Sequence, residues 1–82
     1  MPVFKIKFGE DTRRISLDRA PSFDEMKQIV KQLFNIPQMF VLKYEDEEKD
    51  QITIASDSEL SEALSVASKH FSNLLRLFVF GM

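Results

Sequence analysis

Acidic side chains gather in one short stretch of the chain and again farther along it. Residues 45–50 read Glu-Asp-Glu-Glu-Lys-Asp, and Glu59 and Glu62 follow downstream. Carboxylates at this density can ligate a divalent cation, act as a general acid and base, or attract a cationic partner. Each of these chemistries requires its own spacing and surroundings, so the pattern can be compared with each in turn.

The spacing disfavours the first two chemistries. Asp46, Glu48 and Asp50 stand at positions 1, 3 and 5 of a twelve-residue calcium loop. Gln51, however, replaces the glycine required at position 6, and Asp57 replaces the glutamate required at position 12. Catalytic carboxylates need a cleft that shields them from water, which an exposed loop does not provide. We therefore expect no metal, no cofactor and no enzymatic activity, which leaves a solvated loop or a partner-binding surface.

Basic side chains gather near the start of the chain. Residues 3–8 alternate between apolar and polar types, which predicts a half-buried strand with Lys5 and Lys7 on its outer side. Arg13 and Arg14 begin the segment that is expected to return beside it. Like charges on neighbouring strands destabilise a sheet by roughly a few tenths of a kcal/mol, so these cations favour a patch that binds an acidic partner. Protection of a sheet edge against aggregation is the alternative.

The composition narrows the class of protein. The chain has 82 residues, a net charge of −2 and no cysteine, so it forms no disulfide or thiolate zinc site. Its single histidine, His70, is more typical of a loop residue beside a helix C-terminus than of a catalytic base. No basic excess indicates nucleic acid, and no apolar run approaches the ~20 residues of a membrane span. We expect one cytoplasmic domain over 1–82, the N-terminal part of a longer protein, that binds no membrane, nucleic acid or small-molecule substrate.

The first two strands are expected to form a hairpin. Strand 3–8 pairs with a returning strand over 13–17 across a four-residue turn that starts at Gly9. In this register Lys7 faces Arg14 on the outer side of the sheet, and the apolar residues of both strands face the core.

The remaining segments alternate between helices and strands. A capping box at Ser22 opens an amphipathic helix that Asn35 and Pro37 end, and a second capping signature at Ser56 opens another helix. Further strands are expected over 39–44, 51–55 and 74–80. The last strand is apolar at both parities, which is typical of a central strand covered on both faces. This order predicts an α+β fold with a mixed five-stranded sheet packed with two helices, and it resembles the ubiquitin-like β-grasp roll.

The two charged clusters together resemble a known family. Tyr44, followed by acids at alternate positions, a strand and the acidic helix start after Ser56, is similar to the acidic OPCA motif of the PB1 (Phox and Bem one) domain family. Lys5 is similar to that family's first-strand lysine, and residues 13–14 to the basic pair on its second strand. The chain departs from the pattern at Lys49, where the family usually has glycine, so we expect a differently shaped turn there.

The resemblance implies a protein-interaction module. Family members with both features bind head-to-tail and can build oligomers or filaments with copies of themselves, for a scaffold, a signalling adaptor or an autophagy cargo receptor. The alternative is a heterotypic adaptor that pairs with a different PB1 protein without polymerising. The implied basic patch comprises Lys5, Lys7, Arg13 and Arg14. The implied acidic patch comprises Asp46, Glu48, Asp50, Glu59 and Glu62.

Overall fold

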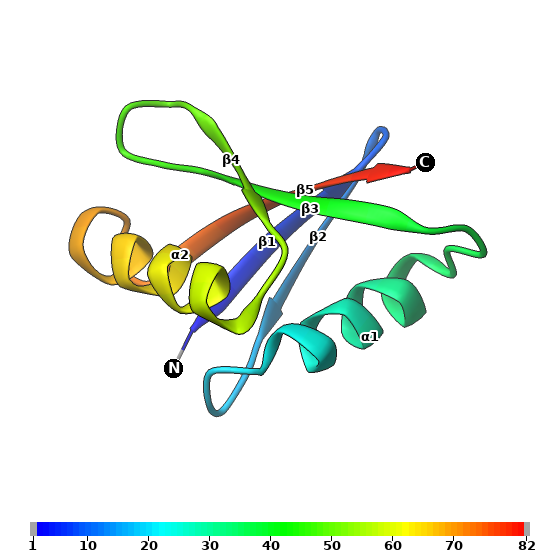
Figure 1. Cartoon of the computed structure of the whole chain (residues 1–82), viewed down its shortest axis with the longest axis horizontal. Helices are drawn as coiled ribbons and strands as arrows, with labels where there is room; N and C mark the ends of the chain where they lie inside the picture. Colours follow the sequence, from blue (N-terminus) through cyan, green and yellow to red (C-terminus); the bar gives the residue numbers. More distant parts are fainter. Residues whose placement is uncertain (1, 82) are drawn as a thin grey trace.

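The first and last strands of the chain lie side by side in the middle of a five-stranded sheet (Figure 1). The computed structural model describes residues 2–81. Its elements, in chain order, are β1 (Val3–Phe8), β2 (Asp11–Ser16), α1 (Phe23–Phe34), β3 (Phe40–Glu45), β4 (Gln51–Ile54), α2 (Asp57–His70) and β5 (Leu74–Gly81). Across the sheet the strand order is β2-β1-β5-β3-β4, with β1 and β5 parallel and the other neighbours antiparallel. The predicted β-grasp roll, with a mixed sheet and two helices, is therefore confirmed.

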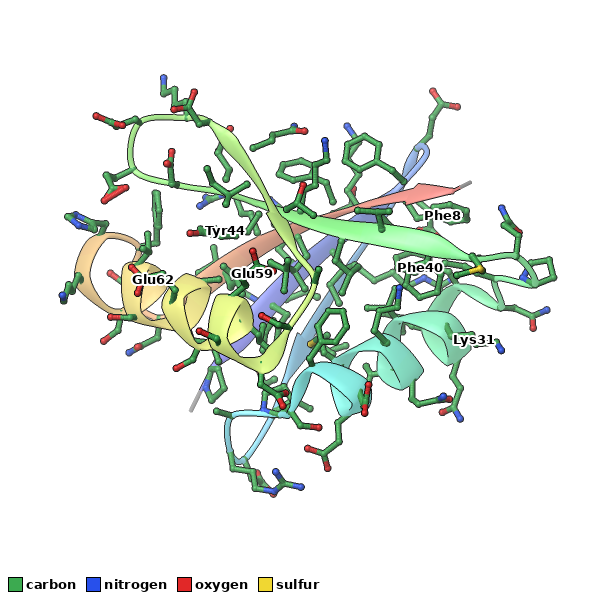
Figure 2. All side chains as sticks on the ribbon, in the orientation of Figure 1. Phe8, Lys31, Phe40, Tyr44, Glu59 and Glu62 are labelled. Carbon is green, nitrogen blue, oxygen red and sulfur yellow. The ribbon has the colours of Figure 1, made fainter. Side chains whose placement is uncertain are left out.

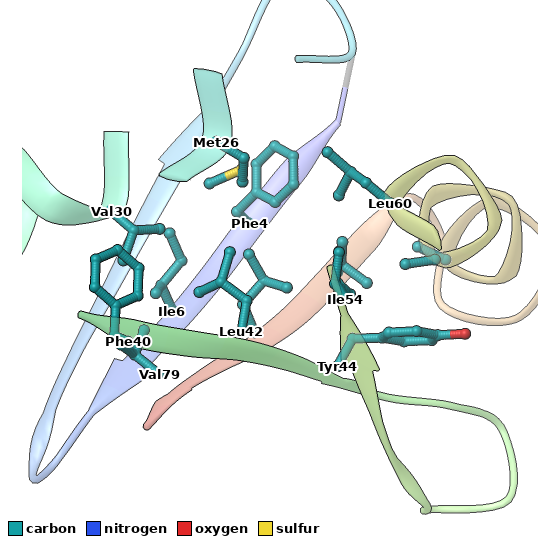
Figure 3. Packing of buried hydrophobic residues seen from close by; sticks show 14 of the residues in the cluster. Phe4, Ile6, Met26, Val30, Phe40, Leu42, Tyr44, Ile54, Leu60 and Val79 are labelled. Carbon is teal, nitrogen blue, oxygen red and sulfur yellow. The ribbon is translucent and has the colours of Figure 1, made fainter. Parts of the chain in front are cut away.

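Both helices cover the same face of the sheet. The strands contribute one parity of residues to the core, as period-two alternation requires, and Figure 3 shows these side chains meeting those of the helices. The buried strand residues are Phe4, Ile6, Phe40, Leu42, Tyr44, Ile54, Leu75, Leu77 and Val79. The buried helix residues are Met26, Val30, Leu60, Ala63 and Ala67. Neither helix within residues 2–81 has the length and apolar character to cross a bilayer.

The other face of β5 carries no second layer within residues 2–81. Leu74, Phe78 and Phe80 alternate with the buried residues of β5, and Phe80 is 43% exposed. The expectation that β5 is covered on both faces is therefore wrong. Long cationic side chains shield part of this apolar surface instead: Lys43 Nζ lies 5.2 Å from the centroid of the Phe80 ring. The apolar residues of β5 therefore belong to two different faces of the sheet: one face is buried under the helices, and the other also carries cations.

The hairpin turn is shorter than expected. Lys5 pairs with Arg14, and Lys7 pairs with Thr12, so the register is shifted by two residues from the prediction. Gly9 adopts φ 61°, a left-handed conformation that glycine adopts without steric cost, and this permits a two-residue turn. Because the shift is an even number of residues, each side chain stays on the face that the alternation predicts.

Local capping interactions define the start of α1. The Ser22 hydroxyl accepts a hydrogen bond from the Glu25 amide, and the Glu25 carboxylate accepts one from the Ser22 amide, which confirms the predicted capping box. Arg19 donates two hydrogen bonds, of 2.8 and 3.2 Å, to the same carboxylate. Asn35 ends the helix in the left-handed conformation at φ 55°.

The hydrogen bonds that the Glu25 carboxylate accepts make the stability of the domain depend on pH. The hydrogen bond from Arg19, and then that from the Ser22 amide, lower the pKa of Glu25 from 4.5 to about 2. A depressed native pKa gives stability that is present above the ordinary pKa and lost as pH falls towards the native one. We expect Glu25→Gln to lower the melting temperature at neutral pH, and the difference from wild type to disappear between pH 4.5 and about 2. Thermal unfolding followed by circular dichroism measures both; a difference that is the same at every pH would contradict the assignment.

Candidate functional site

Cations from three adjacent strands share the sheet face that the helices leave open. Lys5 on β1 stands in register with Arg14 on β2 and with Arg76 on β5, so the three form one row across the sheet. Lys7 lies two residues farther along β1 on the same face. Because β1 is paired on both sides, protection of a sheet edge does not explain Lys5 or Lys7. We call Arg14, Lys5 and Arg76 the cationic row.

Arg13 lies on the opposite face of the sheet, away from the other members of the basic patch. It pairs with Ile6, whose side chain is fully buried under the helices. Its guanidinium donates a hydrogen bond of 3.0 Å to the carbonyl of Leu33, lies 5.4 Å from the Phe34 ring centroid and forms an ion pair of 3.1 Å with Asp11. The structure therefore brings Lys5, Lys7 and Arg14 together, and it uses Arg13 to tie β2 to the end of α1.

The third member of the cationic row, Arg76, is absent from the sequence-based prediction. Its position within an apolar run gave no sign of partnership with the N-terminal cations. Only the parallel pairing of β1 with β5, which joins residues some seventy positions apart, places Arg76 beside Lys5. Lys43 also joins this face, because it pairs with Phe78 on β5. The cationic surface is thus wider than the hairpin alone.

The acidic loop between β3 and β4 is organised by Asp46. Its Oδ1 accepts hydrogen bonds from the amides of Glu48 (3.0 Å) and Asp50 (2.9 Å), and its own amide donates to the carbonyl of Asp50. Carboxylate oxygens of Asp46, Glu48 and Asp50 lie within 4.8 Å of one another. Because Asp46 Oδ1 already accepts two backbone hydrogen bonds, the three carboxylates have fewer free oxygens than the about six to eight that Ca²⁺ takes. The cluster is suited to attracting cationic side chains.

Lys49 holds the turn of this loop in a conformation that glycine favours. Its φ is 66°, and its amide donates a hydrogen bond of 3.0 Å to the carbonyl of Asp46. The turn at Lys49 therefore has a left-handed backbone despite the side chain there, which costs about 1–2 kcal/mol for a residue with a Cβ atom.

Glycine at this position is expected to stabilise the domain. Lys49→Gly relieves the left-handed strain but increases the freedom of the unfolded chain, so we expect a net gain of about 0.5–1 kcal/mol in the free energy of unfolding. Urea denaturation measures it. The matched control is Lys69→Gly in α2, where the lower helix propensity of glycine is expected to destabilise by about the same amount. Equal losses in both variants would show that strain at Lys49 is negligible.

The acidic residues of the loop and those of α2 surround one buried tyrosine. Tyr44 is 5% exposed and lies between the loop and the helix (Figure 2). Burial raises the pKa of its hydroxyl, and the negative charges of Glu62, Asp46, Glu47 and Glu59 raise it further. Two segments that are separate in sequence thus contribute to one negatively charged region.

Glu59 also caps its own helix. Its carboxylate accepts a hydrogen bond of 2.7 Å from the Ala55 amide, and its amide donates one of 3.2 Å to the Ser56 hydroxyl. The hydrogen bond from the Glu59 amide to the Ser56 hydroxyl confirms the predicted capping signature at Ser56. Glu59 therefore contributes to both the helix start and the charge of the region.

His70 contacts the acidic loop from the far end of α2. It is the last residue of that helix rather than a loop residue, and its Nε2 lies 3.2 Å from Glu47 Oε2. This contact joins the C-terminus of α2 to the loop.

The cationic and acidic groups do not neutralise one another within the described molecule. In residues 2–81 the ion pairs join Arg13 to Asp11, Arg19 to Glu25 and His70 to Glu47. None of them links Lys5, Lys7 or Arg14 to the acidic loop. In Figure 1 the β3–β4 loop and the β1–β2 turn lie at opposite ends of the sheet. Within residues 2–81, two oppositely charged surfaces thus lie apart, and no ion pair joins them.

Comparison with known proteins gives a match over nearly the whole chain. The family model described as "PB1 domain" matches residues 2–82. An "HSP-interacting protein" from Zea mays is 36% identical over 63 residues, which cover 77% of this chain and 8% of that protein. The chain thus spans a small part of the length of this curated relative.

Solved structures share the fold. A structure titled "AtNBR1-PB1 domain" superposes with a TM-score of 0.78 at 18% identity, covering 99% of this chain and 97% of that one. A second, titled "Cryo-EM structure of AtNBR1-PB1 filament (L-type)", gives a TM-score of 0.77 at 21% identity with the same coverage.

Proposed function

This chain belongs to the PB1 domain family of protein-interaction modules, and we propose that it assembles head-to-tail with copies of itself. In this proposal the cationic face of one molecule contacts the acidic region of the next. The observation that carries it is the separation of the two surfaces: Lys5, Lys7 and Arg14 form no ion pair with the acidic loop of the same molecule. A structural neighbour whose title describes a filament supports self-association of this fold.

The geometry of the two surfaces determines the form of the assembly. A contact between two different patches is heterologous, and each molecule that binds still has one patch of each kind unoccupied. Such contacts continue into helical filaments or close into rings. We infer that the oligomer grows with concentration instead of stopping at a dimer.

Several charges must act together for this contact to be stable. One exposed ion pair contributes only ~0.2–1 kcal/mol. The cationic row supplies two arginines and a lysine from adjacent strands, and Lys7 adds a fourth cation. Arginine can bind a carboxylate through two hydrogen bonds, which strengthens and orients the contact. We assign Asp46, Glu48 and Asp50 as the main acceptors and place Glu59 and Glu62 at the margin of the contact.

Attraction between exposed charges makes the assembly sensitive to salt. The Debye length falls from ~8 Å at physiological ionic strength to ~3 Å at 1 M, so the attraction across the contact weakens.

Because the match covers only 8% of the curated relative's length, we further propose that the module serves a longer scaffold or cargo receptor.

Sedimentation velocity of paired variants tests the proposal. Lys5→Ala with Arg14→Ala removes one surface, and Glu48→Ala with Asp50→Ala removes the other while retaining Asp46, which holds the loop. Wild type is expected to form large, salt-sensitive species and each double variant to be a monomer. An equal mixture of the two is expected to give a heterodimer, because one intact surface of each kind remains.

The matched control is Lys69→Ala, which removes an exposed cation from α2. It is expected to assemble like wild type. Long assemblies of either double variant in dilute buffer would contradict the proposal. A wild-type monomer that binds a different PB1 domain would identify a heterotypic adaptor instead.

A further inference from the structure

The uncovered sheet face carries aromatic side chains next to its cations. Phe78 on β5 stands in register with Lys7 on β1 and with Lys43 on β3, so a cation flanks it on each side. Phe80 lies two residues farther on the same face and is 43% exposed. The ammonium of Lys43 lies 5.2 Å from its ring centroid. Aromatic rings flanked by cations thus form the centre of this face.

A hollow accompanies these side chains. It has a volume of about 500 Å³, and its lining includes Lys7, Gln51, Phe78 and Phe80. These residues come from β1, β4 and β5, so the hollow extends across the sheet. We call it the aromatic groove. Its volume is sufficient for a large side chain, and its lining offers both an apolar surface and the amine of Lys7.

We propose that the aromatic groove binds an acidic peptide segment of a partner protein that carries an aromatic or large aliphatic side chain. The apolar side chain would lie against Phe78 and Phe80, and neighbouring carboxylates would reach Lys7 and Lys43. The charges of the face favour such a partner, since its register positions hold Lys5, Lys7, Arg14, Lys43 and Arg76 against one acid, Glu45. Burial of the ring and neutralisation of the flanking amines would reinforce each other.

A second copy of the chain docked face to face does not fit this surface. Two copies of the aromatic groove would bring cations of like sign together, and such contacts are strongly unfavourable. The groove shares Lys7 with the basic patch, whereas Phe78, Phe80 and Lys43 belong to neither the basic patch nor the acidic patch. Substitutions at Phe80 and Lys43 therefore test the groove without removing a charge assigned to head-to-tail assembly.

Fluorescence anisotropy with two labelled peptides tests the groove. One peptide alternates aspartate with phenylalanine, and the other has serine in place of each phenylalanine. The protein carries Glu48→Ala and Asp50→Ala, so that assembly does not compete with the measurement. We expect the phenylalanine peptide to bind at least about tenfold more tightly, because the two peptides have the same charge and differ only in apolar surface.

Substitution of Phe80 in the groove and substitution of Lys43 beside it are each expected to weaken this binding by about fivefold. Phe80→Ser removes the exposed ring, and Lys43→Gln removes the adjacent charge. Met39→Ser is the matched control, since Met39 is 77% exposed immediately before β3 and lies outside the groove lining. It is expected to bind like the parent protein. Urea denaturation of each variant confirms that it is folded.

Several results would overturn the proposal. Equal binding of the two peptides would mean that charge alone attracts them, and equal weakening by Met39→Ser would mean non-specific apolar contact. Binding to phosphatidylserine vesicles that depends on Phe80, without such peptide binding, would identify a membrane surface instead. Loss of wild-type assembly on Phe80→Ser, without an effect on the peptide, would assign the face to contact between copies. Failure of head-to-tail assembly alone would leave the peptide result unchanged.

Discussion

A chain in which the charges of the two surfaces are exchanged is expected to assemble with itself but not with wild type. The exchanged chain carries Lys5→Glu and Arg14→Glu on the sheet, and Glu48→Lys and Asp50→Lys on the loop. In contacts between exchanged molecules the four exchanged positions are again opposite in sign, while Lys7, Arg76 and Asp46 keep their charges. In contacts with wild type, both kinds of junction place like charges together, which costs several kcal/mol and weakens binding by at least about hundredfold.

Sedimentation velocity of the exchanged chain, alone and mixed with labelled wild type, measures this discrimination. Each half of the exchange made alone is the control, and it is expected to abolish self-assembly while leaving the fold intact. The residues chosen are exposed, and Asp46 is kept because it bonds the loop backbone. Co-assembly of exchanged and wild-type chains would show that other contacts hold the molecules together.

Truncation of Phe4 is expected to produce the largest loss of stability. The Phe4 side chain is 0% exposed and lies between Met26 of α1 and Leu60 of α2 in Figure 3, so it joins both helices to the sheet. Phe4→Ala removes this packing and leaves a cavity, which costs about 3–5 kcal/mol. Against a total stability of about 5–15 kcal/mol for a domain, the variant is expected to be close to unfolding.

Urea denaturation of Phe4→Ala and Phe80→Ala compares the two faces of the sheet. Phe80 is 43% exposed on the face that no helix covers within residues 2–81, so its truncation is expected to cost about 1 kcal/mol or less. Both positions are phenylalanines in strands of the same sheet, so the two variants differ mainly in how deeply the truncated side chain is buried. Similar losses at the two positions would mean that the uncovered face contributes to the core.

The features predicted correctly depend on interactions within a few residues. The capping box at Ser22 joins groups three positions apart, and the alternation over residues 3–8 determines which side chains face the core. The acidic loop could be predicted equally well, because residues 45–50 are contiguous in the sequence. For such features the sequence contains both partners of each interaction in one short window.

The features that were missed depend on pairing between distant segments or on one local torsion. Nothing near Arg76 indicates that it stands beside Lys5, since that follows from the parallel register of β1 and β5. The hydrophobic pattern allows either turn length, and the left-handed conformation of Gly9 selects the shorter one. That shorter turn pairs Arg13 with Ile6 on the core side, next to α1. The composition of a sheet surface therefore depends on how the strands pair as well as on the sequence of each strand.

The parallel contact between β1 and β5 has a consequence for synthesis on the ribosome. The strand that carries Lys5 emerges first, yet one of its two neighbours, β5, emerges last. Until then β1 has an open edge, and β3 lacks its link to the N-terminal hairpin. Loop-closure entropy makes such long-range pairing slow. The nascent domain therefore completes its sheet only after translation has passed residue 81, and Arg76 joins Lys5 in the cationic row only from that moment.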